Sequence, residues 1–143
     1  MAITSAICNS FKQEILEAEH NFTASSGNTF NLALYDSGAD LSKTTTAYTT
    51  SEELATTGGY TAKGKALTSV TPVLDSDTAV CDFANISWTS ASFTARGCLI
   101  FNDDNIDTSV CAIDFGGDKT VTSGTFTVEF PAAAASTAII QIA

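Results

Sequence analysis

Positive charge is scarce in this 143-residue chain. It carries six Lys and Arg residues against 16 Asp and Glu residues, which gives a formal net charge of −10 at pH 7. Binding to the phosphate backbone of nucleic acids needs a basic face, and so does attraction to an anionic membrane surface. The composition therefore argues against nucleic acid and against membranes as partners.

Long apolar runs are also lacking. The longest extend over only a few residues, whereas a membrane-spanning helix needs ~20. The N-terminus has no cationic start followed by an apolar stretch, which predicts that the chain carries no signal peptide.

The cysteines and the histidine lack the short sequence spacing that is typical of metal sites. The chain has four cysteines and one histidine, and no two cysteines form a C-x-x-C pair. We therefore expect no metal and no cofactor, and we expect reduced thiols packed in the core. A disulfide formed after release from the cell is the alternative. The cysteines are Cys8, Cys81, Cys98 and Cys111.

Catalytic motifs are absent too. No G-x-S-x-G elbow and no phosphate-binding glycine loop occurs. If residues 8–20 were all helical, Cys8 and His20 would lie ~18 Å apart, too far for a catalytic pair. We expect His20 at a helix C-terminus, where its protonated form interacts favourably with the helix dipole. The sequence predicts no catalytic residues and no enzyme.

The residues that are present indicate a β protein. The chain holds 22 Thr and 15 Ser, its apolar content is 44%, and nine Phe can fill a core. We predict a mainly β fold, an antiparallel β-sandwich or jelly-roll-like domain with one N-terminal α-helix. Residues 1–22 would form an N-terminal arm and amphipathic helix, and residues 23–143 a single β domain.

Alternating apolar residues and turn residues place the strands and their connections. The predicted strands cover residues 29–36, 65–74, 78–88, 92–101, 109–115, 125–130 and 137–142. The predicted turns lie at 75–77, 102–107, 116–118 and 131–135.

Apolar residues recur at helical spacing in the first 22 residues. Ser10 and Gln13 fit a capping box that starts the helix at Phe11, leaving residues 2–9 as an arm, and Asn21 could end it. The apolar face either packs on the protein's own sheet or docks on a neighbouring subunit. The interface candidates on this face are Ile3, Ile7, Phe11 and Ile15.

Residues 36–64 form a polar stretch that is long for a loop in a compact domain. Residues 51–54 could form one short helical turn inside it. The stretch is either an ordered surface loop with Tyr48 and Tyr60 packed inward, or a loop that contacts a partner. Tyr48 and Tyr60 complete the candidate interface residues.

Two charged features have structural and functional interpretations. Residues 103–107 resemble the start of a calcium loop but lack its glycine, so a solvated hairpin tip is expected, with weak cation binding as the alternative. Arg96 is the only arginine, and we expect it to pair with Asp82 or Asp114 or to contact another subunit.

Nine stretches of the sequence follow one another in a characteristic order. They are M-A-I-T-S-A-I-C-N-S-F-K-Q-E-I-L at 1–16, H-N-F at 20–22, N-T-F-N-L-A-L-Y at 28–35, T-A-Y-T-T at 46–50, L-T-S-V-T-P-V at 67–73, C-D-F-A at 81–84, F-T-A-R-G-C-L-I-F-N at 93–102, D-F-G-G-D-K-T-V-T-S-G-T-F-T at 114–127 and A-I-I-Q-I-A at 138–143. In these stretches and their order, the chain resembles short virion structural proteins of tailed bacteriophages.

This resemblance implies a non-enzymatic virion component made and assembled in the host cytoplasm. The leading hypothesis is a capsid decoration, or cement, protein on the capsid surface. Its partners would be the major capsid protein and further copies of itself, with a trimer expected by analogy with other cement proteins. The alternative is a tail, head-fibre or adhesion module in which Tyr48, Tyr60 and Trp88 stack on host glycans.

Overall fold

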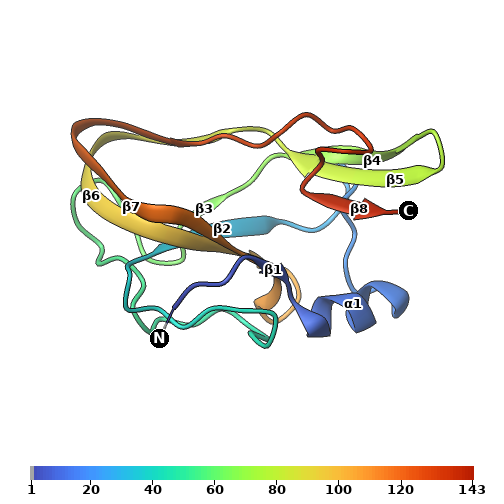
Figure 1. Cartoon of the computed structure of the whole chain (residues 1–143), viewed down its shortest axis with the longest axis horizontal. Helices are drawn as coiled ribbons and strands as arrows, with labels where there is room; N and C mark the ends of the chain where they lie inside the picture. Colours follow the sequence, from blue (N-terminus) through green and yellow to red (C-terminus); the bar gives the residue numbers. More distant parts are fainter. Residues whose placement is uncertain (1) are drawn as a thin grey trace.

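The computed structural model describes residues 2–143 as a β-sandwich with one helix (Figure 1). Strands hold 48% of the residues and helix 6%, and both sheets are antiparallel. The fold class predicted from the composition is confirmed.

The larger sheet has the strand order β1-β7-β6-β2-β3, and the smaller sheet has the order β4-β5-β8. The elements are β1 (Ala6–Ile7), α1 (Asn9–Leu16), β2 (Phe30–Tyr35), β3 (Lys65–Ala66), β4 (Ser69–Asp75), β5 (Thr78–Phe83), β6 (Ile86–Asn102), β7 (Thr108–Val128) and β8 (Ile140–Ile142).

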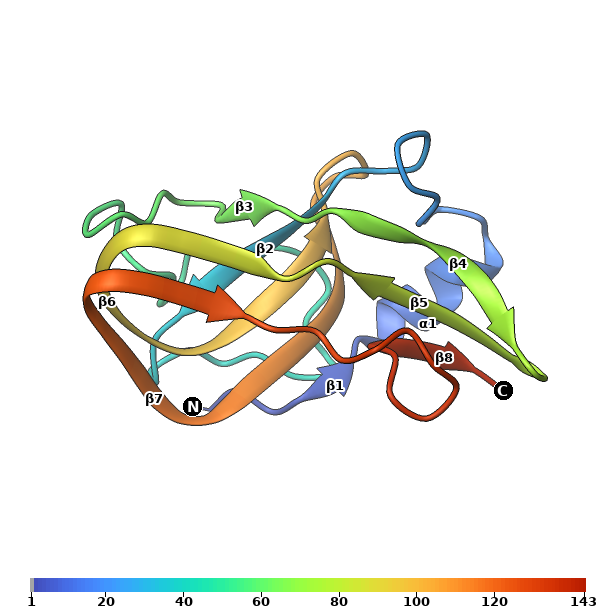
Figure 2. The same ribbon diagram turned by 90° about the horizontal axis from the view of Figure 1, so that it is seen from above.

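The hairpin of β6 and β7 runs through both layers of the sandwich. Figures 1 and 2 show the two strands curving together from one layer into the other at the end far from α1. Register shifts interrupt their pairing at several points, including the step from Ala95 to Gly97. Such irregularities bend strands, which explains how one hairpin serves two layers.

This hairpin corrects the predicted strand boundaries. The turn expected at 116–118 lies inside β7, so the segment 109–115 and residues 125–128 of the segment 125–130 are parts of one strand. Gly116 has a φ of 80°, which lets the backbone bend there without ending the strand. The segment 78–88 instead divides into β5 and the start of β6.

The sandwich has two apolar clusters on opposite faces of β2. Leu32 and Leu34 belong to the main core, whereas Ala33 and Tyr35 face a second core beneath residues 36–64. Alternation along one strand therefore fills two cores, which is why almost every residue of β2 is buried.

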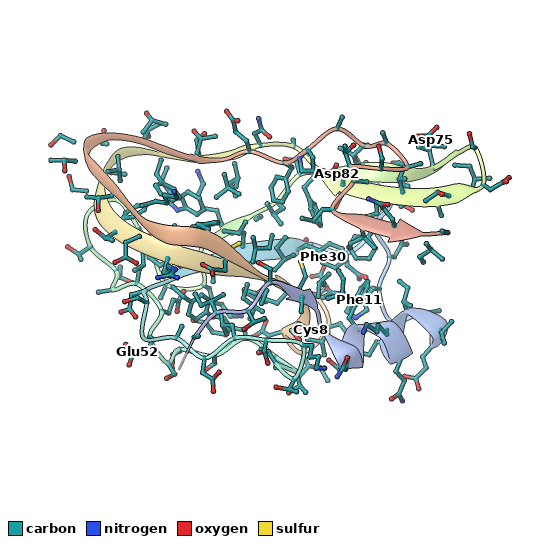
Figure 3. All side chains as sticks on the ribbon, viewed as in Figure 1. Cys8, Phe11, Phe30, Glu52, Asp75 and Asp82 are labelled. Atoms are coloured by element: carbon teal, nitrogen blue, oxygen red, sulfur yellow. The ribbon has the colours of Figure 1, made fainter. Side chains whose placement is uncertain are left out.

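Aromatic rings fill much of the main core. Phe22 and Phe30 stack with ring centroids 4.2 Å apart, and Phe11 packs edge-on against Phe22. Phe11 and Phe30 are labelled in the interior in Figure 3. At the other end of the core, Trp88 is 3% exposed and packs against Phe126.

The N-terminal segment is part of the sandwich rather than a separate arm. Strand β1 pairs with β7, and Ile3 forms a bridge with Leu41. Together with the burial of Phe11 and Phe22, these contacts tie residues 2–22 to the domain that the sequence analysis placed at 23–143. Met1 lies outside the described residues.

The helix is shorter than predicted and is capped differently. It begins at Asn9 after an extended Cys8 that makes no side-chain capping bond, so the capping box is wrong. The Ser10 hydroxyl is buried without a hydrogen-bond partner. The helix ends at Leu16, well before Asn21, and Ala18 turns the chain with a φ of 60°.

Residues 36–64 contain no named strand or helix and fold as an ordered loop. The helical turn expected at 51–54 is a non-helical turn in which Glu52 has a φ of 60°. No helix within residues 2–143 is long and apolar enough to cross a membrane.

Gly64 closes this loop where it meets β2. Its φ is 67°, and a Cβ atom there would overlap the carbonyl oxygen of Leu32. We expect Gly64→Ala to lower the free energy of unfolding by more than ~2 kcal/mol, because both strain and overlap oppose the side chain. Urea unfolding measures the change. Gly117→Ala is the matched control, since its Cβ would meet nothing within 4 Å; an equal effect of both substitutions would contradict this explanation.

Candidate functional site

The structure buries three of the six predicted interface residues inside the chain itself and half-buries the other three. Ile3, Phe11 and Tyr60 are 6%, 4% and 2% exposed. Ile7, Ile15 and Tyr48 are half-buried and pack against the two cores. Only the region around Phe11 and Ile15 borders an open apolar cleft, described below.

Glu53 holds the loop of residues 36–64 together. One carboxylate oxygen accepts hydrogen bonds from the Tyr60 hydroxyl and the Lys63 backbone N–H, each at 2.7 Å, and the other accepts one from the Tyr48 hydroxyl. The Tyr60 hydroxyl in turn accepts a hydrogen bond from the Leu34 N–H at 3.0 Å. Burial and the neighbouring Glu53 raise the pKa of both Tyr48 and Tyr60.

These hydrogen bonds favour the ordered-loop interpretation of residues 36–64. Tyr60 lies in the main core and Tyr48 packs against Phe101 in the second core. Stacking on a sugar ring needs an open aromatic face, which Tyr60 and the buried Trp88 do not offer.

Removal of the Glu53 carboxylate should loosen this loop. We expect Glu53→Ala to lower the free energy of unfolding by at least ~2 kcal/mol, because it leaves several partly buried donors unpaired. Hydrogen exchange of the Lys63 amide should accelerate in the same variant. Glu52→Ala provides the control, since Glu52 is exposed at the periphery (Figure 3). Unchanged exchange at Lys63 would contradict the role given to Glu53.

His20 is buried and does not lie at a helix end, so its expected interaction with the helix dipole is wrong. Its Nδ1 accepts a hydrogen bond from the Asn102 side-chain amide at 3.0 Å, and Nε2 lies 3.5 Å from a Glu14 oxygen. The imidazole packs among the rings of Phe11, Phe22 and Phe30. Burial lowers the pKa of His20, although Glu14 and Glu19 act in the opposite direction.

This environment makes stability depend on pH below neutrality. Because the folded protein binds a proton at His20 less readily than the unfolded chain, stability is lost as pH falls through the unfolded pKa of 6.5. We expect the free energy of unfolding to fall between about pH 7 and about pH 5.5. In His20→Gln, which can still accept from Asn102, this decrease should be smaller.

Urea unfolding at both pH values checks the His20 effect. The difference between wild type and variant isolates it, because Asp82 titrates in both proteins. Burial raises the pKa of Asp82, so its contribution to stability has the opposite dependence on pH. An unchanged pH dependence in His20→Gln would exclude His20 as the responsible group.

All four cysteines are free and buried, as the core-thiol prediction requires. They lie in the main core, and burial raises the pKa of each, that of Cys81 to about 12. A thiol with a raised pKa is a poor nucleophile and a poor metal ligand. Among residues 2–143, no group of three or more His, Cys, Asp or Glu residues could hold a metal ion.

Ion pairs occupy two of the positive charges. Arg96 pairs with Asp114 at 2.9 Å, which confirms one of its two expected partners. Asp82 is not that partner, because it is 1% exposed within β5 and accepts a hydrogen bond from the Phe83 N–H. Lys63 bridges Asp103 and Asp107 at 3.0 Å each, so the hairpin tip is tied to the loop of residues 36–64.

An open groove runs along β7 from Ile113 to the end of the strand. Its volume is about 600 Å³, and both apolar and polar side chains line it. The apolar part includes Ile113, Phe115, Val121, Phe126, Phe130 and Ile139. We call it the β7 groove.

A smaller apolar cleft lies between α1 and the three-stranded sheet. Its volume is about 130 Å³. One wall comes from Phe11, Ile15 and Phe22, and the other from Ala79, Ile140 and Ile142. We call it the helix–sheet cleft. Figures 1 and 2 show α1 lying beneath the smaller sheet.

Exposed apolar residues extend this cleft outward. Leu74 and Ile142 are 74% and 58% exposed and lie in register on either side of Ala79. Sequence analysis missed both residues because each lies in a segment that reads as an ordinary strand. The signal that could have identified Leu74 is strand alternation, which places it on the same face as Pro72.

Comparisons with known proteins add no relative. No family model, no curated protein and no solved structure matches the chain.

Proposed function

We propose that this protein is a non-enzymatic structural component of a tailed-phage virion, most specifically a capsid decoration protein. In this role it bridges neighbouring capsomers and stabilises the head against internal DNA pressure. The resemblance of its segments to short phage virion proteins, which extends over almost the whole chain, supports the proposal. The major capsid protein and further copies of this chain would be its partners.

The structural observation that carries the proposal is a β-sandwich with open apolar surfaces. The β7 groove and the helix–sheet cleft are both lined by apolar side chains that no part of residues 2–143 covers. Contiguous open apolar surface commonly marks a site of protein interaction. In a shell with many copies, weak contacts at such surfaces suffice because they act together.

A tail, head-fibre or glycan-binding module is the second candidate. The burial of Tyr60 and Trp88 removes two of the three aromatic residues that would stack on sugars. The open apolar surfaces favour a protein partner instead.

Quantitative mass spectrometry of purified virions tests the proposed function. We expect a copy number equal to that of the major capsid protein or a simple fraction of it, since decoration follows the symmetry of the shell. A number that matches tail symmetry would support the second candidate. Absence from virions would overturn both.

A further inference from the structure

The size of the helix–sheet cleft limits what can enter it. A volume of about 130 Å³ is below the ~300 Å³ at which small-molecule sites begin. An apolar cavity of ~150 Å³ can hold a benzene molecule, so this cleft has room for about one large apolar side chain. A single side chain buried in a dry pocket is how protein interfaces anchor their partners.

The charge around the cleft further restricts the kind of partner that can bind there. Residues 66–95 and 120–143, which include the three strands of the smaller sheet, contain no Lys or Arg. On α1, Lys12 is the only positively charged side chain. Each wall of the cleft is followed or preceded in sequence by an acidic residue: Glu17 comes two residues after Ile15, and Asp77 comes two residues before Ala79. Both are exposed and belong to no ion pair within residues 2–143.

We propose that the helix–sheet cleft is the docking site for a protein segment that presents a large apolar side chain flanked by Lys or Arg. The apolar side chain enters between Ile15 and Ile142, and the flanking cations face Glu17 and Asp77. The assignment of this segment to the capsid rests on the proposed function. The argument from the size and charge of the cleft does not depend on that function.

A second copy of this chain fits the cleft less well. Each copy carries a net charge of −10, so two acidic cleft regions repel each other. The exposed apolar Leu16 of another copy is followed directly by Glu17 instead of a cation. Charge complementarity therefore selects a basic partner.

Phage heads that lack this protein provide the first test, with binding measured by sedimentation. Leu74→Asp/Ile142→Asp should weaken binding at least tenfold, because it places charge at the apolar mouth. Both side chains are exposed, so the fold should survive, and circular dichroism verifies this. Ile106→Asp is the control, since Ile106 is 89% exposed at the tip between β6 and β7.

Charge reversal gives a second measurement on the same heads. Glu17→Lys/Asp77→Lys should weaken binding at least threefold and reduce its dependence on salt. Asp40→Lys/Glu52→Lys changes the net charge equally in the exposed loop of residues 36–64 and should leave binding within twofold of wild type. Cleft variants that bind heads as tightly as wild type would overturn the proposed docking site and leave the proposed function intact.

If the wild-type protein does not bind heads, that result counts against the proposed function. A peptide then tests the docking site independently of the heads. The probe is acetyl-Lys-Lys-Leu-Lys-Lys-amide, titrated into the ¹⁵N-labelled protein, with the same peptide carrying Glu in place of Lys as control. We expect chemical-shift changes confined to Ala79, Ile140 and Ile142 for the basic peptide alone. Equal shifts with both peptides, or none at the cleft, would overturn the proposal. If the wild-type protein associates with itself and Leu74→Asp/Ile142→Asp abolishes that association, the occupant of the cleft is a second copy, and the proposal is overturned.

Discussion

The pairing of β6 with β7 is the constraint on which the rest of the structure depends. The two strands bend together from one layer into the other and so connect the two layers. Both apolar cores form against them: Trp88 and Cys98 face the main core and Leu99 faces the second. The β7 groove follows from the same pairing, since β1 covers only Cys111 and Ala112 on the other side of β7.

Much of this fold could be predicted from the sequence, and the exceptions have physical reasons. Alternation located β2, and the turns at 75–77 and 102–107 were correct. The glycines at 116–117 indicated a turn because the sequence does not distinguish a strand that bends from one that ends. The buried state of His20 was also missed, because its partner Asn102 is distant in sequence and becomes a neighbour only when β6 packs near α1.

The candidate interface shows what apolar periodicity measures. The spacing of Ile3, Ile7, Phe11 and Ile15 correctly indicates residues that are covered, but it does not say whether the same chain or a partner covers them. Here the chain's own sheet and loop cover most of that surface. The open apolar residues lie on β4 and β8, where only the arrangement of the strands in space reveals them together.

The pairing of β1 with β7 also determines the order in which this protein can fold. Ala6 and Ile7 can pair only after Ala112 and Cys111 have been synthesised, more than 100 residues later. Until then, β1 has no partner strand. Contacts of such long sequence separation slow folding and prolong the exposure of aggregation-prone intermediates. The pairing that closes the larger sheet at β1 is therefore a late step in folding, although it involves residues near the start of the sequence.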